Sequence, residues 1–551
     1  MGVSPQASPG RRLSFTNIAG YMPGSKVTQH NAVDMDQAAM QTAIAVKTAA
    51  GFAAGESIYR NGGHSKSYAE FTIPAAVNAI AADTAVSGFA LDGVTALTGT
   101  VKSSVAVSGT ILKVVYFSSE TQSRVPSCAA GGLPATSHII SQTGCFHATG
   151  PLSIAAQTGI AAHTINPDSY DPVTDTKAGR TLRGFSTGAG SKMRTGCPGC
   201  PYTDFIKAYE YYGVDDYSDR WVIGALTATK VDFNGPNGRG SADFSTTNDG
   251  DTRVEAAKKG AAYMGTWMYV VREFEDAIDD CVDGAINRND DPVHAWDEGV
   301  AFYTGTFTQA ALAPGGTGSG TTGMMPYTLA EKRCQNFKTC GQAGDTSTGT
   351  SQVNIELFRL FALAQYSLQM GQCADVRPLL HQITALMTVP LIQGTLRYAN
   401  AAKRIDPKGK AEGATFAAAL LPRLHSCSPA DAAIVYDHMK IGSTEADPYA
   451  AVQAAIRGVG NANLYCMNVT CAHVGGLTVG GSANEAYISG AEPCLDPAPP
   501  SGLGLTDGER AGVIVGALIG GLAILFLFMC VCCMVKKEKA GKPLFTTMNA
   551  A

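Results

Sequence analysis

The sequence predicts a mainly α protein with a smaller β-containing region, that is, an α+β ectodomain of two subdomains plus one C-terminal transmembrane helix. Three observations predict it. Most segments outside residues 72–195 repeat apolar residues at helical spacing, residues 101–117 alternate and are rich in valine, and residues 511–535 form an uncharged apolar run.

The apolar run reads AGVIVGALIGGLAILFLFMCVCCMV. At a rise of about 1.5 Å per residue, such a helix spans roughly 37 Å, enough to cross a bilayer with some tilt. Lysines follow it from Lys536 to Lys542, so the positive-inside rule places residues 536–551 in the cytosol and the preceding chain outside the plasma membrane. The alternative, a buried core helix, rarely runs this long without a polar residue.

The flanks of this segment carry further signals. Residues 494–510 are rich in Pro, Gly and Ser and predict a flexible stalk. Three cysteines at the cytosolic end are either sites of S-palmitoylation or apolar fillers: Cys530, Cys532 and Cys533. Small residues at four-residue spacing favour a homodimer through the anchor: Gly512, Gly516 and Gly520.

Cysteine usage indicates an oxidising compartment. Twelve cysteines precede the membrane segment, an even number that allows up to six disulfides. The close pairs Cys334/Cys340 and Cys466/Cys471 are typical of local loops, although the connectivity cannot be deduced. Asn468 begins a glycosylation sequon. Met1 to Arg12 has no apolar signal segment, so either the natural chain begins further upstream, which we favour, or the last helix inserts into the membrane by itself.

Roughly 510 residues before the anchor are too many for one core. We expect an N-terminal segment (1–33) that is truncated or disordered, a first half with a β-containing insert (34–200) and a second, mainly helical half (201–493). Helical patterns cover 35–59, 251–283, 291–305, 353–370, 376–402 and 411–425. Residues 101–117 predict a strand pair around Ser108-Gly109.

Tyrosines and acids gather between Tyr209 and Asp219, in the sequence YEYYGVDDYSD. Phenolate and carboxylate oxygens are hard anionic ligands, which a ferric ion prefers. The alternative is a helix–turn–helix corner in which the tyrosines only pack. A formal net charge of −5 argues against nucleic-acid partners, and no P-loop or HExxH motif points to an enzyme.

Three other segments carry candidate site residues. The stretch NGGHSKS has the composition of an anion nest, or of a helix C-cap and an ordinary turn; its members are Gly63, Ser65, Lys66 and Ser67. In the helix over 251–283, Glu275 lies at the edge of an apolar stripe and Asp279 one turn further. His294, Asp297 and Glu298 have spacings that let them meet on one helix face, although a solvated polar face is commoner. Cys197 and Cys200 predict a plain disulfide.

Several of these segments resemble the algal iron-assimilating proteins, also called low-iron-inducible periplasmic proteins, which include the membrane-anchored phytotransferrins. The most specific stretch is HAWDEGVAFYTG at residues 294–305. The motifs around Tyr59 to Ser67, Tyr211 to Tyr217 and Ala330 to Gly341 are similar too. The resemblance covers residues 34–471.

The resemblance implies cell-surface capture of ferric iron with carbonate as synergistic anion, followed by endocytosis through machinery that contacts the tail. On chemical grounds we then expect the first metal ligands among Tyr59, Tyr68, Tyr211, Asp215, Tyr217 and Glu275. Second candidates are Asp219, Asp279, His294, Asp297 and Glu298. The nest residues would hold carbonate. The alternative function is a membrane-anchored adhesion or cell-coat glycoprotein without a metal; a secreted-face hydrolase or reductase lacks a supporting motif.

Overall fold

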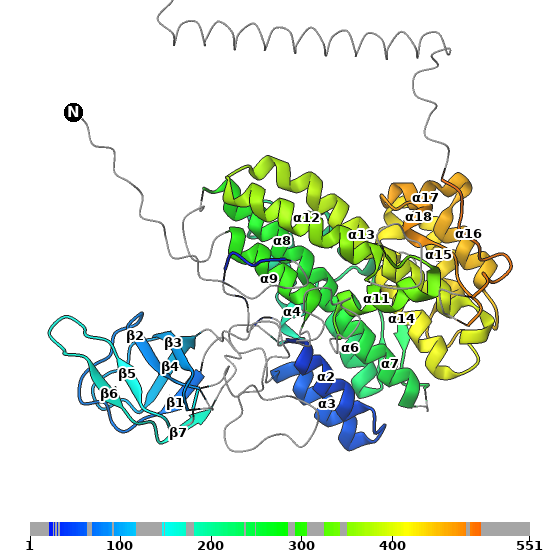
Figure 1. Cartoon of the computed structure of the whole chain (residues 1–551). Helices are drawn as coiled ribbons and strands as arrows, with labels where there is room; N and C mark the ends of the chain where they lie inside the picture. The colour runs from blue at the N-terminus through cyan, green and yellow to red at the C-terminus, as the bar shows by residue number, and fades with distance from the viewer. Residues whose placement is uncertain are drawn as a thin grey trace, which may run out of the picture. The chain divides into compact units, whose positions relative to one another are not determined.

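The computed structural model describes residues 21–25, 27, 30, 33–62, 69–90, 93–116, 146–147, 149–171, 181–235, 239–247, 250–284, 292–305, 324–341, 350–480 and 485–496 (Figure 1). The chain divides into two units between Cys494 and Leu495, where the stalk was expected to begin. Both expected halves of the ectodomain belong to the first unit. The stalk beyond Asp496, the span 511–535 with its glycines and cysteines, and the tail lie outside the described residues.

Helices form most of the first unit, which confirms the mainly α prediction (Figure 1). They are α2 (Val33–Ile44), α3 (Ala49–Asn61), α4 (Gly184–Thr187), η2 (Gly190–Arg194), α5 (Thr203–Tyr212), α6 (Tyr217–Thr227), α7 (Gly250–Gly260), η4 (Ala261–Thr266), α8 (Trp267–Val282), α9 (Pro292–Thr304), α11 (Pro326–Phe337), α12 (Gln352–Gln369), α13 (Cys373–Ala399), η5 (Ala401–Lys403), α14 (Pro407–Cys427), α15 (Pro429–Met439), α16 (Tyr449–Arg457), η6 (Val459–Asn461), α17 (Ala462–Cys466) and α18 (Cys471–Val474).

One expected helix is wrong, because residues 35–59 form two helices rather than one. Lys47 takes a left-handed backbone conformation (φ 55°), which ends the first helical run. Thr48 then caps α3 by accepting the N–H of Gly51 at 3.1 Å. The alanine-rich composition hides this break, since alanine favours a helix on both sides of it.

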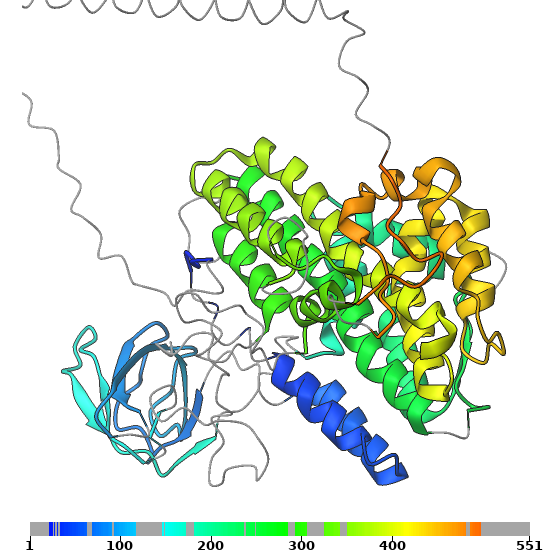
Figure 2. The same ribbon diagram turned by 45° about the vertical axis from the view of Figure 1, so that its right-hand side comes forward.

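The β-containing region is a curled antiparallel sheet of seven strands in the order β6-β5-β2-β3-β4-β1-β7 (Figures 1 and 2). Its strands are β1 (Ala69–Thr72), β2 (Ala85–Phe89), β3 (Ala96–Val101), β4 (Ile111–Tyr116), β5 (Leu152–Ile154), β6 (His163–Ile165) and β7 (Ser169–Asp171). The sheet has a core of its own, which includes Phe71, Leu112 and Phe146. A separate pair, β8 (Lys230–Val231) and β9 (Ala242–Asp243), follows α6.

Of the expected strand pair over 101–117, only the second strand forms where it was predicted, as β4, and its partner β3 lies earlier in the chain. β3 ends at Val101 and pairs with β4, with Val101 opposite Val114. Val105 forms only an isolated bridge with Ile80, and Ser108 has a φ of 65°. The alternating valines between residues 101 and 107 therefore belong to the connection and not to a strand.

A large aromatic core fixes α8, α9 and α12. The ring centroids of Phe274 and Trp296 are 4.3 Å apart, and the indole N–H of Trp296 donates to the carbonyl of Phe361 at 3.0 Å. Gly299 permits this approach, because a Cβ there would lie 2.5 Å from the Phe274 ring. The face of α9 opposite Trp296 is thereby held in one orientation.

Among the described helices, α13 is long and apolar enough to cross a membrane by length and composition. Most of its apolar stretch (83%) is buried inside the protein. It packs against α12 and α14 in the main core. We therefore interpret it as a core helix.

Five disulfides join described cysteines, namely Cys197–Cys200, Cys281–Cys373, Cys334–Cys340, Cys427–Cys466 and Cys471–Cys494. The CxxC and the Cys334/Cys340 loop are confirmed as disulfides. A local Cys466–Cys471 pair is wrong, because Cys466 bonds Cys427 and Cys471 bonds Cys494. Cys128 and Cys145 lie outside the described residues.

Candidate metal centre

The site begins on α9, where helical spacing places His294 and Glu298 on one face. The Nε2 atom of His294 lies 3.1 Å from Oε1 of Glu298. Both side chains are largely buried, with 18% and 11% of their surface exposed. Because Trp296 anchors the opposite face, this pair points away from the aromatic core.

His30 completes the group from the segment that precedes α2. It is fully buried, and its Nε2 atom lies 2.5 Å from the same Glu298 Oε1 atom. Its ring packs edge-on against Phe302 at 5.6 Å and against His294 at 5.7 Å. One ligand atom from each of His30, His294 and Glu298 falls within 4.8 Å of the others. We call these three residues the histidine–glutamate cluster.

Behind His294 lies a buried carboxylate relay. Asp297 accepts the N–H and the hydroxyl of Ser25 at 2.8 Å and 2.7 Å. It also accepts the hydroxyl of Tyr21 and the amide of Gln365. Ser25 Oγ is 3.0 Å from Nδ1 of His294. The relay therefore joins Asp297 to His294 through one hydroxyl.

With Asp297 ionised, this relay determines which ring nitrogen of His294 carries the proton. Ser25 has a single hydroxyl hydrogen, and it donates that hydrogen to Asp297. Nδ1 of His294 must then be the donor toward Ser25 Oγ, which leaves the lone pair of a neutral imidazole on Nε2. That lone pair faces the Glu298 carboxylate. A cation or a proton between them is required to make this contact favourable.

Burial shifts the pKa values of the ionisable groups around the cluster. Burial raises the pKa of Asp297, although the hydrogen bonds from Tyr21 and Ser25 oppose the rise. Burial, and then the charge of Asp297, raises the pKa of Tyr21 well above its ordinary value. On α8, burial raises the pKa of Glu273 to about 7 against the opposing charge of Arg272, with Glu298 adding to the rise.

Of the predicted ligands on α9, His294 and Glu298 meet directly, and Asp297 joins them through Ser25. Sequence reasoning missed His30, Ser25 and Tyr21, because all three lie in the segment 1–33 that was expected to be truncated or disordered. The described parts of that segment are instead packed against α9 and α12. A lone histidine before a helix gave no specific signal.

Tyr59 and Asp219 are also brought together, but beside a cation. The Asp219 carboxylate acts electrostatically on the Tyr59 hydroxyl, and Arg183 Nε lies 3.3 Å from Asp219 Oδ1. Burial, and then the Asp219 charge, raises the pKa of Tyr59 well above its ordinary value. The arginine already neutralises the carboxylate that a metal would need.

Tyr211 and Tyr217 lie in the core on either side of Tyr212. Tyr217 stacks on Tyr212 at 4.9 Å, and Tyr211 meets it edge-on at 4.9 Å. Their hydroxyls diverge: that of Tyr217 is 3.4 Å from the Met264 carbonyl, and that of Tyr211 has no hydrogen-bond partner among the described residues. No carboxylate joins either hydroxyl in this part of the chain.

The remaining acids each have a partner of their own. Asp215 pairs with Arg194 at 3.3 Å near the surface. Glu275 pairs with Arg377 at 2.7 Å. Asp279 accepts the N–H of Gly199 and the hydroxyl of Tyr202, and so anchors the Cys197–Cys200 loop. The structure does not bring these three together with the tyrosines.

Tyr68 and the four nest residues Gly63, Ser65, Lys66 and Ser67 lie outside the described residues. The described chain reaches Gly62 (φ 62°), where a Cβ would lie 2.9 Å from the Asp36 carboxylate. Asn468 is exposed in the turn after α17, a position that an added glycan could occupy.

Comparisons with protein-family models, with curated proteins and with solved structures give no match to this chain. The chemical interpretation therefore rests on the geometry of the site.

Proposed function

We propose that this protein binds a transition-metal ion, with iron as its physiological metal, at the histidine–glutamate cluster. The observation that carries the proposal is the convergence of two imidazoles, from segments far apart in the sequence, on one carboxylate oxygen of Glu298. An ordinary buried ion pair needs only one of these histidines.

The donor spacing supports a metal. Ligands that lie about 2.0–2.2 Å from one metal ion are roughly 3–3.5 Å from each other. The cluster's ligand atoms already lie within 4.8 Å of one another, so small side-chain adjustments suffice. The Asp297–Ser25 relay orients His294 as carboxylates and hydroxyls that are hydrogen-bonded to the other ring nitrogen orient metal-bound histidines.

The chemistry of the donor atoms narrows the choice of metal ion. Two imidazoles and a carboxylate suit Fe(II) and Zn(II), and leave coordination positions for further ligands. The resemblance of residues 294–305 to the iron-assimilating proteins favours iron. Capture of ferric iron at the cell surface, with carbonate held by the nest residues and uptake by endocytosis, extends this proposal through the resemblance alone.

The test is an equilibrium competition titration of the full chain, purified in detergent, with Fe(III), Fe(II) and Zn(II), each with and without bicarbonate. His294→Gln is the test variant. His438→Gln is its matched control, because His438 lies on α15 beside Glu445 and is not a donor of the cluster. We expect wild type and the control to bind iron alike and His294→Gln to bind it at least about 100-fold more weakly.

Equal iron affinities in the two variants would place the metal elsewhere, and absence of binding to any of the ions would favour the adhesion function. Visible absorbance in the same titration tests for tyrosinate coordination. A charge-transfer band that disappears in Tyr68→Phe would add Tyr68 to the ligand set.

A further inference from the structure

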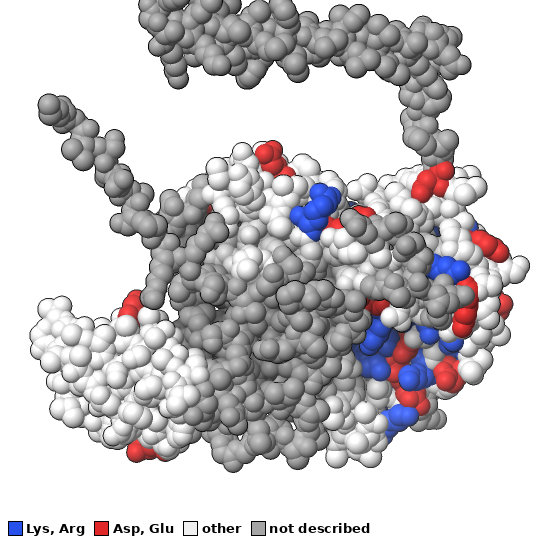
Figure 3. All heavy atoms as spheres, in the orientation of Figure 1, with Lys and Arg blue, Asp and Glu red and all other residues white. Residues whose placement is uncertain are grey.

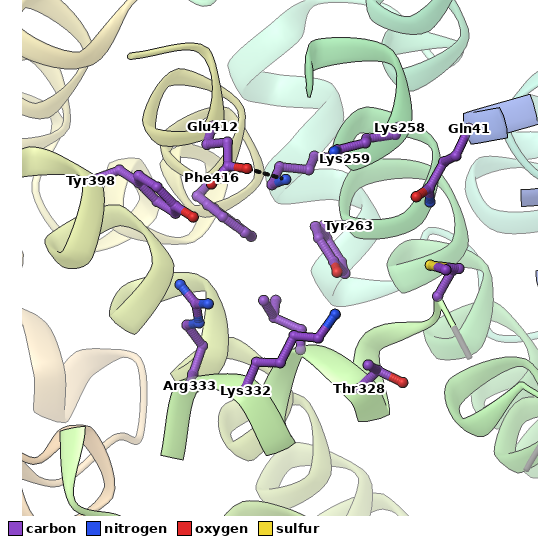
Figure 4. Close-up of a pocket in the computed structure, with 12 residues that line it drawn as sticks. Gln41, Lys258, Lys259, Tyr263, Thr328, Lys332, Arg333, Tyr398, Glu412 and Phe416 are labelled. Carbon is purple, nitrogen blue, oxygen red and sulfur yellow. Dashed lines mark hydrogen bonds and ion pairs between the residues drawn. The ribbon is translucent and has the colours of Figure 1, made fainter. Parts of the chain in front are cut away.

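A polar cavity with a volume of about 250 Å³ lies between α7, η4, α11 and α14, apart from the histidine–glutamate cluster (Figure 4). Four cations and one carboxylate line it: Lys258, Lys259, Lys332, Arg333 and Glu412. We call it the α11 pocket. Figure 3 shows charged side chains gathered on the face of the protein where α7 lies. The pocket shares no lining residue with the histidine–glutamate cluster.

Part of the positive charge is compensated within the pocket. Lys259 lies between Glu255 and Glu412, with contacts of 2.6 Å and 2.9 Å, and Lys258 pairs with Glu255 at 2.6 Å. Two carboxylates thus neutralise two lysines. Lys332 and Arg333 on α11 form no ion pair with any described carboxylate, and Arg397 on α13 forms none either.

Arg333 is the decisive residue. Only 8% of its surface is exposed, and its Nε and Nη1 atoms have no hydrogen-bond partner among the described residues. Figure 4 shows its guanidinium pointing into the cavity beside Tyr398 and Phe416. The Nε and Nη1 atoms of Arg397 likewise have no hydrogen-bond partner in the described part of the chain. Burial, and then the neighbouring charge of Arg397, lowers the pKa of Arg333 to about 10.

Aromatic rings form the rest of the wall. Phe416 stacks between Tyr263 and Tyr398, at centroid distances of 5.4 Å and 5.9 Å. Tyr263 comes from the π-helical segment η4, and such segments recur at functional sites. The widened turn lets the chain present Lys258, Lys259 and Tyr263 to the same cavity.

We infer that the α11 pocket binds a small, multiply charged oxyanion whose phosphate or carboxylate oxygens accept hydrogen bonds from Arg333 and Lys332. A buried guanidinium without a partner is costly, and a doubly or triply charged anion would satisfy it and relieve the repulsion from Arg397. Arginine forks match the geometry of both phosphate and carboxylate groups. The cavity volume suits phosphate or a citrate-sized molecule better than a nucleotide.

The experiment measures thermal unfolding and calorimetric binding of the full chain with phosphate, citrate or chloride at constant ionic strength. We expect phosphate, citrate or both to raise the unfolding temperature, and chloride to have no specific effect. The anion that raises the unfolding temperature shows whether the pocket prefers phosphate groups or carboxylate groups. Lys332→Gln and Arg333→Met should weaken binding by about tenfold to about 100-fold, as expected for the loss of a charged hydrogen bond.

Lys408→Gln is the matched control, since Lys408 is exposed on α14 and does not line the pocket. It should bind the anion like wild type. Should Arg333→Met fail to fold, Lys332→Gln, at an exposed rim position, still decides the question. No binding of phosphate or citrate at millimolar concentration, or equal binding by Lys332→Gln and Lys408→Gln, would overturn the proposal.

Discussion

Two regions of this protein contain candidate metal donors, but only one of them brings its donors together. The corner from Tyr209 to Asp219 holds four tyrosines and four acids in eleven residues. Three of these tyrosines pack against one another, and three of the acids face arginines. The histidine–glutamate cluster has only three donors, drawn from residues 30 to 298, and all three converge. A candidate metal site is therefore defined by donors that converge in the fold, and composition alone does not reveal it.

The largest expected effect concerns the corner as a packing element. Tyr217→Ala removes a buried ring that stacks on Tyr212, so we expect it to lower the free energy of unfolding by about 3–5 kcal/mol. Tyr217→Phe should cost under about 1 kcal/mol, because the hydroxyl contact is long (3.4 Å). Chemical denaturation of metal-free protein measures both. Tenfold weaker iron binding by Tyr217→Phe would instead make the corner a metal site.

Next in size is a comparison of two buried glutamates. Glu298→Gln should weaken metal binding by at least about 100-fold, because it removes the anionic ligand that both histidines face. Glu275→Gln is the matched control, since Glu275 is buried and paired with Arg377. It should leave metal affinity unchanged. If Glu275→Gln weakened metal binding more than Glu298→Gln in a competition titration, the metal ligand would lie on α8 and not on α9.

A smaller effect is expected from the relay. Ser25→Ala breaks the link between Asp297 and His294 while keeping every donor of the cluster. We expect metal affinity to fall by about tenfold and the metal-free fold to remain stable. Ser443→Ala, another serine hydroxyl bonded near a histidine, serves as the control. Unchanged affinity in Ser25→Ala would show that the tautomer of His294 is set by other groups.

The smallest expected effect is a difference in pH dependence. Burial raises the pKa of Asp219, although Arg183 opposes the rise. Between the ordinary pKa and the raised one, the folded state binds more protons than the unfolded state, so this group makes stability fall as pH rises. Asp219→Asn should remove that slope in metal-free protein. Metal affinity at the cluster should show the opposite trend and rise with pH, as histidines lose their protons.

Parallel denaturation and metal titrations between pH 4 and pH 7 measure the two trends. Identical stability slopes in wild type and Asp219→Asn would mean that Asp219 does not titrate differently on folding. Metal affinity that increases toward acid pH would contradict coordination by histidine.

The sequence predicted the fold well where local periodicity decides it. The helices around Glu275, His294 and Leu360 appear close to their expected bounds, because a long amphipathic pattern reports burial directly. The break at Lys47 and the position of β3 were missed, since each depends on one residue's backbone conformation or on strand partners distant in sequence. The connectivity of Cys466 and Cys471 failed for the same reason.

The candidate site was predictable only in part. Helical spacing predicted that His294 and Glu298 lie together, because residues four apart on a helix are neighbours one turn away. His30 and Ser25 contact α9 although they are more than 260 residues away in the sequence, and no local sequence pattern predicts such a contact. The ionic partners of Asp215, Asp219 and Glu275 are likewise tertiary, so their neutralisation by arginines was not visible in the sequence.

The most direct test of the central claim is iron K-edge X-ray absorption of the iron-loaded full chain, compared with His294→Gln. We predict the outer-shell scattering of two imidazole rings in wild type and of fewer in the variant. A spectrum with oxygen ligands alone, unchanged in His294→Gln, would contradict the histidine–glutamate cluster as the metal site.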